Sequence, residues 1–270
     1  MPLRAHLAEL RVRVVKSGIA IIAGAVAGWF LEPWVFQALQ DPLIRAARAH
    51  HVQAAINFND VLAPFNLRIK LSVYVGLVLA SPVWLYQLWA FIVPGLTRRE
   101  KRYSAGFVSA GVPLFIGGLS LAWFVLPNAV NFFTTFVPKD STAFTSADEY
   151  FTFATRLMLS FGAAFILPLV LVALNFVGVM SALTLAKGWR IAVFLTFLFA
   201  AMASPTPDVT MMFVLALPMV ALYLGAVGVA WLHDRRVARR QLAEGFGGVA
   251  DDEASPLDYH PAAVDEPDGS

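Results

Sequence analysis

Long apolar stretches separated by short polar segments make up the chain between about residue 17 and residue 232. A helix needs about 20 apolar residues to cross a hydrocarbon layer about 30 Å thick, and several stretches reach or approach that length. The apolar residues run continuously and do not alternate with polar ones, which favours helices over membrane strands. The pattern therefore predicts an all-α, polytopic membrane protein.

Six spans are expected from these stretches, at 17–36, 61–93, 103–126, 150–179, 191–203 and 209–232. The second is too long to cross upright as one straight helix at about 1.5 Å of rise per residue. Pro82 lies within it, where we expect a bend, because proline removes a backbone donor and clashes with the preceding turn. The fifth span is short, about 20 Å if helical, and predicts a locally thinned bilayer beside spans five and six.

The placement of charge predicts the orientation of the spans. Lys and Arg gather before the first span, between the second and third, between the fourth and fifth, and after the sixth. Cytoplasmic loops carry such an excess, so both termini should be cytoplasmic, and an even number of spans agrees. We expect a cytoplasmic amphipathic segment at 1–16, a six-helix membrane domain at 17–232, and a cytoplasmic tail at 233–270, basic and then acidic and disordered.

Composition narrows the chemistry. The chain is 59% hydrophobic and 14% charged, well below the charged content of about 25% in soluble domains. It has no cysteine, which excludes disulfides and thiol chemistry. The sequence shows no nucleotide-binding loop, metal-ligand cluster or nucleophile with a base, so we expect no enzyme activity, cofactor or metal.

The first candidate cluster lies just before the first span. It contains a single acid, Glu9, among the basic residues Arg11 and Arg13. From the residues alone, Glu9 and Arg13 form a solvated i,i+4 pair. Further along, Gly24 and Gly28 form a GxxxG pattern that could pack a partner helix, although we favour chance spacing in a span rich in glycine and alanine.

The second candidate cluster lies at the end of the second span. Aromatic residues at such a place usually form an interfacial belt, and a Pro-Gly pair usually forms a turn. Asp208 follows Pro207 at the start of the last span, where aspartate favours a helix N-cap. The members of the second cluster are Tyr86, Gln87, Trp89, Phe91, Pro94 and Glu100.

Together these segments resemble the TatC family. Pro82, Tyr86-Gln87-x-Trp89-x-Phe91, Pro94 and Glu100 resemble the family's run at the end of its second span. His6-Leu-x-Glu9-Leu-Arg11 resembles its N-terminal motif, Asp41-Pro42-Leu43 its first outer loop, and Ser204-Pro-Thr-Pro-Asp208 its turn between spans five and six. The resemblance covers roughly residues 4 to 235 and follows the family's order.

The resemblance implies a receptor and channel-forming subunit of a twin-arginine protein translocase in the cell (inner or plasma) membrane. Such a subunit binds the twin-arginine signal peptides of folded cargo, works with TatA/TatB-type single-span subunits, and uses the proton-motive force. It implies a homo-oligomer within the receptor complex, contacts with membrane lipids, and no nucleic acid.

The resemblance also assigns roles to residues. Glu9 and Glu100 would bind the two arginines, since Arg–carboxylate contacts can be bidentate and charge-assisted. The remaining signal-peptide residues would be Arg11, Gln87, Tyr86, Trp89 and Phe91, the aromatic ones packing against the signal's apolar segment. Pro42, Pro82, Pro94 and Asp208 would form structural or functional turns, with a role in transport for Asp208.

Two positions depart from the family pattern. Ile166 in the fourth span and Leu224 in the sixth stand where many members carry glutamate. A mechanism that requires an intramembrane acid in this subunit is therefore not expected. The contact with the single-span partner would be apolar, or its polar partner would come from elsewhere.

Two other functions remain open from the residues alone. A small-solute secondary transporter should contain midplane charges and internal repeats, and we identify neither in the sequence. A membrane scaffold without a transport role would not need the clusters around Glu9 and Glu100.

Overall fold

The computed structural model describes residues 3–49, 53–92, 101–136, 142–203 and 209–243. Within these ranges the chain is almost entirely helical, which confirms the all-α class. The elements are α1 (Leu3–Ala49), β1 (Gln53–Asn57), α2 (Ala63–Leu79), α3 (Ser81–Ile92), α4 (Lys101–Thr134), β2 (Thr142–Ser146), α5 (Ala147–Phe176), α6 (Ala182–Lys187), α7 (Trp189–Ala203) and α8 (Val209–Ala243).

Several helices have the length and apolarity of membrane spans. Among the described residues, four segments qualify alone, and α2 with α3 makes a fifth when the bent pair is counted as one span. Helix α7 is apolar but has only 15 residues. The multi-pass architecture is thus confirmed, whereas a sixth crossing depends on α7. The four segments are Leu7–Arg48, Ala105–Thr134, Ala147–Phe176 and Met212–Arg239.

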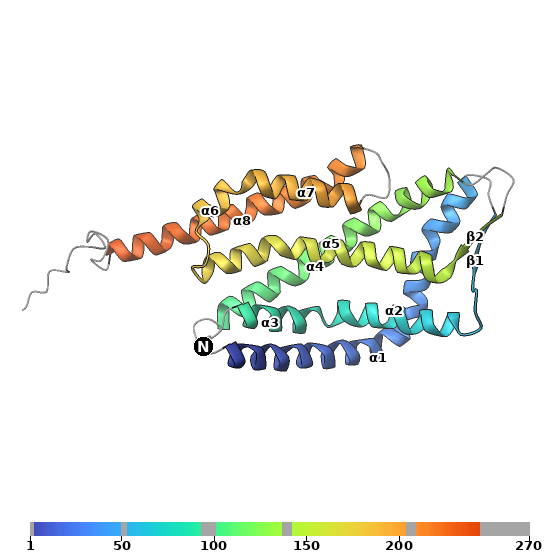
Figure 1. Ribbon diagram of the computed structural model, residues 1–270, viewed down its shortest axis with the longest axis horizontal. Helices are drawn as coiled ribbons and strands as arrows, with labels where there is room; N and C mark the ends of the chain where they lie inside the picture. Colours follow the sequence, from blue (N-terminus) through green and yellow to red (C-terminus); the bar gives the residue numbers. More distant parts are fainter. Residues whose placement is uncertain (1–2, 50–52, 93–100, 137–141, 204–208, 244–270) are drawn as a thin grey trace, which may run out of the picture.

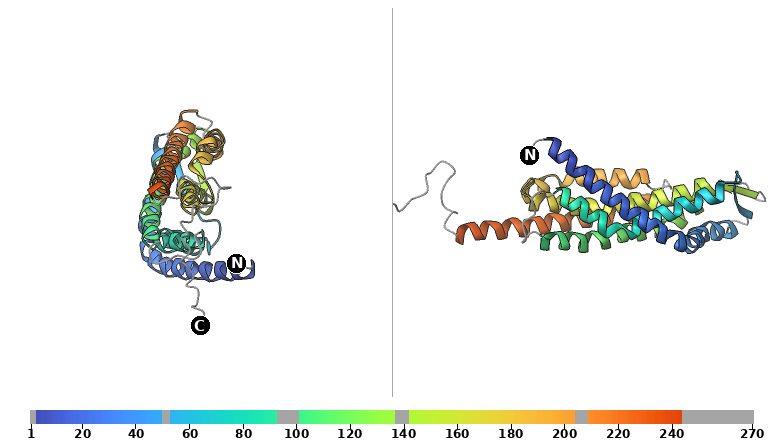
Figure 2. Two further views of the ribbon diagram at one scale, coloured as in Figure 1. Left: turned by 90° about the vertical axis from the view of Figure 1, so that its left-hand side faces the viewer. Right: turned by 90° about the horizontal axis from the view of Figure 1, so that it is seen from below.

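Most of the helices run roughly along one long axis, whereas the second half of α1 turns across it (Figure 1). The start of α1 and the end of α8 lie at the same end of the bundle, which we call the termini end. Strands β1 and β2 lie at the opposite end, which we call the sheet end, and pair in parallel from Gln53↔Thr142 to Asn57↔Ser146. Seen along the long axis, the helices follow an open curve from α1 through α4 to α8 (Figure 2).

The bend in the second predicted span is confirmed. Helices α2 and α3 meet at Ala80 with an angle of 59°. Pro82 occupies the first turn of α3, where a missing backbone N–H leaves no intrahelical hydrogen bond unmade. Across the break, the indole Nε1 of Trp84 donates to the carbonyl of Leu77 at 3.0 Å, so one carbonyl near the end of α2 gains an added partner.

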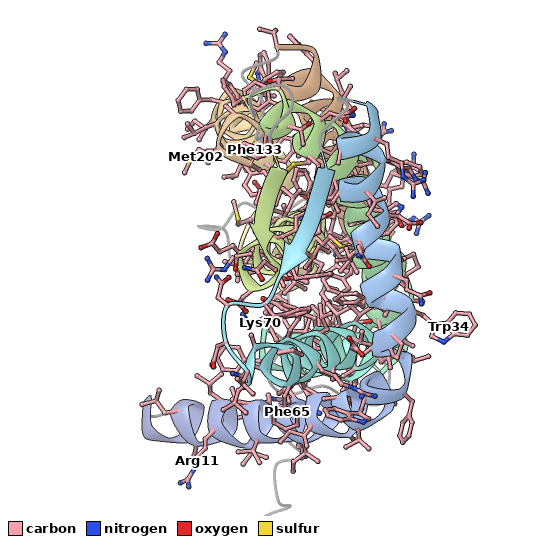
Figure 3. All side chains as sticks on the ribbon, turned by 90° about the vertical axis from the view of Figure 1, so that its right-hand side faces the viewer. Arg11, Trp34, Phe65, Lys70, Phe133 and Met202 are labelled. Carbon is pink, nitrogen blue, oxygen red and sulfur yellow. The ribbon has the colours of Figure 1, made fainter. Side chains whose placement is uncertain are left out.

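Helix α1 is much longer than its predicted span. It continues through Asp41-Pro42-Leu43, so the prediction that Pro42 forms a turn is wrong. Figure 3 shows the half of α1 that carries Arg11 running crosswise to the half that begins near Trp34. The sheet-end half lies against α4 and α5, since Leu39 and Leu43 are buried in one cluster with residues of those helices.

Glycines bring α1 and α2 into close contact. A Cβ placed on Gly24 would lie 2.6 Å from the carbonyl oxygen of Gly76, and one on Gly28 would lie 2.4 Å from that of Ser72. Both distances are too short for any side chain. The GxxxG pattern therefore packs α2 of the same chain, and our preference for chance spacing was wrong.

Candidate functional site

Glu9 lies on the termini-end half of α1 and pairs with Arg13. The guanidinium donates from Nε to Oε1 of Glu9 at 3.1 Å and also donates from Nη2 to the same oxygen. The residues alone indicated this i,i+4 pair. Because both hydrogen bonds go to Oε1, Oε2 can still accept from an incoming guanidinium. Arg11 is exposed and points away from the bundle (Figure 3).

The predicted aromatic residues of α3 divide between surface and interior. Tyr86 is exposed, while Gln87 and Phe91 are half-buried. Trp89 is only 3% exposed and stacks on Phe107 of α4, with ring centroids 4.6 Å apart. Trp89 therefore packs in the interior between α3 and α4 and does not form part of the exposed face of α3. Helix α1 packs along both α2 and α3, so the helix that carries Glu9 and the helix that carries these aromatic residues are neighbours.

Three predicted site residues lie outside the described residues. Glu100 and Pro94 fall in 93–100, and Asp208 falls in 204–208. The residues that flank the first of these segments are described. Ile92 ends α3 and Lys101 begins α4, and both helix ends lie at the termini end (Figure 1).

A buried charge pair between α1 and α2 was missed by the sequence reasoning. Glu32 is only 8% exposed, and its Oε2 lies 3.5 Å from Nε of Arg68. Both residues fall inside predicted spans, so these spans hold charged residues that the sequence reasoning did not single out. The signal was an acid in span one and an arginine in span two. Their pairing depends on the register of α1 against α2, which no sequence pattern reveals.

A second missed cluster closes the α5–α6 turn against α8. Asp234 accepts hydrogen bonds from Asn175 Nδ2 at 2.9 Å and from the backbone N–H of Ala182 at 2.8 Å. Asn175 also donates to the carbonyl of Met180 at 2.9 Å. Both oxygens of Asp234 are thus engaged within the chain. This carboxylate at the termini end is a structural clamp and is not placed to receive a guanidinium pair.

We expect Asp234→Ala to lower the stability of the protein by about 1–3 kcal/mol, because Asn175 and the N–H of Ala182 lose their acceptor. The measurement is the thermal midpoint in detergent, together with proteolysis of the α5–α6 turn. Arg236→Ala is the matched control, since Arg236 is an exposed neighbour on the same helix. Equal midpoints for the two variants would contradict the clamp.

An apolar groove lies between α5, α7 and α8. Its volume is about 580 Å³, and small side chains form much of two walls. Ile166 does not reach it, because that side chain is buried with Leu85 and Phe115, while Leu224 is exposed on α8. The small residues are Ser160, Ala163 and Ala164 on α5, and Ala192 and Thr196 on α7.

These features define the class of the molecule. Its membrane-length helices follow an open curve, and Glu9 and the aromatic residues of α3 lie on neighbouring helices. The chain is therefore a multi-pass membrane protein.

Comparison with known proteins supplies the family. Residues 5–218 match the model of the Sec-independent protein translocase protein TatC. The chain is 50% identical over 240 residues to the TatC protein of Xylanimonas cellulosilytica, covering 89% of this chain and 87% of the relative. The TatC protein of Aquifex aeolicus is 32% identical, with 90% and 100% covered. The chain belongs to the TatC family and is a subunit of a Sec-independent protein translocase.

Solved structures agree with this assignment. A crystal structure of the twin-arginine translocase receptor TatC superposes with a TM-score of 0.65 and 32% identity, over 84% of this chain and 98% of the other. A second crystal structure of that receptor, in DDM, gives a TM-score of 0.67 at the same identity. The fold described above is therefore the TatC fold.

Proposed function

We propose that this protein is the receptor for twin-arginine signal peptides and the core of a translocase that exports folded proteins across the cell membrane, driven by the proton-motive force. The observation that carries the proposal is the carboxylate of Glu9, which keeps one oxygen for a further donor on a helix that packs against α3, where Tyr86 is exposed. Membership of the TatC family supports it.

The Glu9–Arg13 pair is weak enough for an arginine of the signal peptide to replace Arg13. An i,i+4 ion pair on a helix contributes a few tenths of a kcal/mol, whereas a hydrogen bond to a charged group contributes about 1.5–3 kcal/mol. An incoming arginine can therefore share or replace Arg13 at little cost. Glu100, the second acid of the proposal, would receive the other guanidinium, and the planar Arg fork selects against lysine.

The proposed orientation has both termini in the cytoplasm and α7 as a short sixth span. Basic residues of α1, α6, α7 and α8 at the termini end support it. Since the chain has no cysteine, single cysteines can report sidedness without background. A cysteine at Arg236 should react with an impermeant maleimide only after the cells are opened, and one at Asn57 should react in intact cells. The reverse pattern would invert the topology.

The groove between α5, α7 and α8 is the proposed seat of a single-span TatA/TatB-type subunit. In a bilayer, helices associate through close van der Waals packing, which small residues permit. Ala163 and Ala164 of α5 and Ala192 of α7 provide such walls. Many family members carry a glutamate at the position of Ile166, and that acid could make a polar contact with the partner. In this chain Ile166 is buried in another cluster, so the proposed contact with the partner is apolar and is made by the groove.

We expect Ala163→Trp to reduce co-purification of the single-span partner by about tenfold or more, because the indole fills the groove and overpacks the contact. Ala163 is exposed on the groove wall, so the thermal midpoint of the isolated subunit should stay unchanged. Phe124→Trp on α4, also exposed, is the control and should leave the complex intact. Undiminished co-purification of the Ala163→Trp protein would remove the groove from the proposal.

A further inference from the structure

Helix α1 contains a proline at the point where it changes direction. Pro33 lies inside α1, and Figure 3 shows the second half of the helix departing near Trp34. Proline has no backbone N–H, so the carbonyl of Trp29, four residues earlier, loses its intrahelical donor. An unsatisfied backbone group at membrane depth costs several kcal/mol. The bend is therefore stable only if another group serves that carbonyl.

Arg68 of α2 is the group that reaches it. Its Nη2 donates to the carbonyl oxygen of Trp29 at 3.5 Å, and its guanidinium carbon lies 4.3 Å from the centroid of the Trp29 ring. Its Nε lies 3.5 Å from Oε2 of the buried Glu32. All three contacts converge on the turn immediately before Pro33. The guanidinium has several donors in one plane, which lets it serve a carbonyl and a carboxylate together.

We propose that Arg68 is a positioning residue that replaces the hydrogen bond removed by Pro33 and thereby fixes the bend of α1. The bend sets two placements. The first half of α1, which carries Glu9, lies along α2 and α3, and the second half lies against α4. Arg68 thus fixes the position of Glu9 through α1, although it lies far from Glu9 along the bundle.

A simpler role for Arg68 is to neutralise Glu32 alone. The two roles differ in their dependence on Pro33. Pro33→Ala returns an N–H to position 33, which can donate to Trp29 in the ordinary way, but leaves Glu32 unchanged. If Arg68 serves the carbonyl, its removal should matter much less in the Pro33→Ala background. If it serves only Glu32, its removal should matter equally in both backgrounds.

The experiment compares four full-length proteins: wild type, Arg68→Met, Pro33→Ala and the double variant. We expect Arg68→Met to lower the thermal midpoint in detergent by about 3–8 °C with Pro33 present, and by less than half of that in the Pro33→Ala background. Arg68→Met leaves the Glu32 charge unpaired in both backgrounds, so this contribution to the loss of stability cancels when the two losses are compared. Equal losses in the two backgrounds would overturn the proposal.

A second measurement follows the bend itself. Spin labels on Val12→Cys and Arg48→Cys, both exposed positions of α1, report the distance across it. A straight helix would separate these Cα atoms by about 54 Å at about 1.5 Å per residue. We expect one shorter distance in wild type, a broader distribution with Arg68→Met, and a narrow one in the double variant.

Labels on Ala105→Cys and Phe124→Cys of α4 are the reference pair and should not change in any of the four proteins. This pair separates a local effect on α1 from general unfolding. An unchanged α1 distribution in the Arg68→Met protein, with the reference pair also unchanged, would show that Arg68 does not hold the bend. Broadening of both pairs together would show that Arg68 supports overall folding and would equally reject the proposal.

Discussion

Replacing Glu9 and Glu100 together by glutamine is expected to abolish export of a folded twin-arginine cargo. Glutamine keeps the size and one hydrogen-bonding oxygen of each side chain but removes the charge. Each charge-assisted hydrogen bond contributes about 1.5–3 kcal/mol, so the loss of two should weaken signal binding by about 100-fold or more. The measurements are cross-linking of the signal peptide to the termini end of α3 and export of a fluorescent cargo in a strain lacking its own subunit.

Arg13→Gln is the matched control for this prediction. It breaks the same ion pair as Glu9→Gln but leaves the carboxylate in place, so binding and export should stay near wild type. A signal with two lysines should bind more weakly than one with two arginines. Normal export by the double glutamine variant would end the receptor proposal. A small-solute transporter or a passive scaffold would show no signal contact even in the wild-type protein.

The second large effect is expected at the contact between α1 and α2. In Gly28→Val the new Cβ would lie 2.4 Å from the carbonyl oxygen of Ser72, which is backbone and cannot turn aside. The two helices must separate, and overpacking costs about 1–3 kcal/mol, with larger values in some cases. We expect loss of the folded protein from membranes and loss of export, measured by immunoblot and cargo assay.

Gly18→Val on the same helix is the control. A Cβ at Gly18 meets no atom within 4 Å. Both variants replace glycine by valine in the same helix, so the change in helix propensity is the same for the two. This variant should accumulate and export cargo like wild type. If Gly18→Val and Gly28→Val behaved alike, helix propensity would explain the result and the close contact would not.

Features set by one stretch of sequence were predictable. Apolar length identified the membrane class, and Pro82 identified the bend between α2 and α3, because a proline acts on its own backbone wherever it lies. The Glu9–Arg13 pair followed from i,i+4 spacing on one helix. Each of these depends on residues that are neighbours along the chain.

Features set by contact between distant segments were not predictable. Pro42 was expected in a turn, yet packing of Leu39 and Leu43 against α4 and α5 keeps α1 helical through it. Trp89 was expected to face the signal peptide, yet Phe107 of α4 stacks on it. In each case, a tertiary contact decided what the local pattern left open.

The parallel pairing of β1 with β2 has a consequence for biogenesis. β1 follows the first helix, while its partner precedes α5. The chain is synthesised from its N-terminus, so β1 cannot pair with β2 until α2, α3 and α4 have been made. Closing so long a loop is entropically unfavourable until those helices have packed. The two strands therefore pair late in folding. A protease added on the side of the sheet end should cut newly synthesised chains near residues 58–62 and should leave fully folded chains intact.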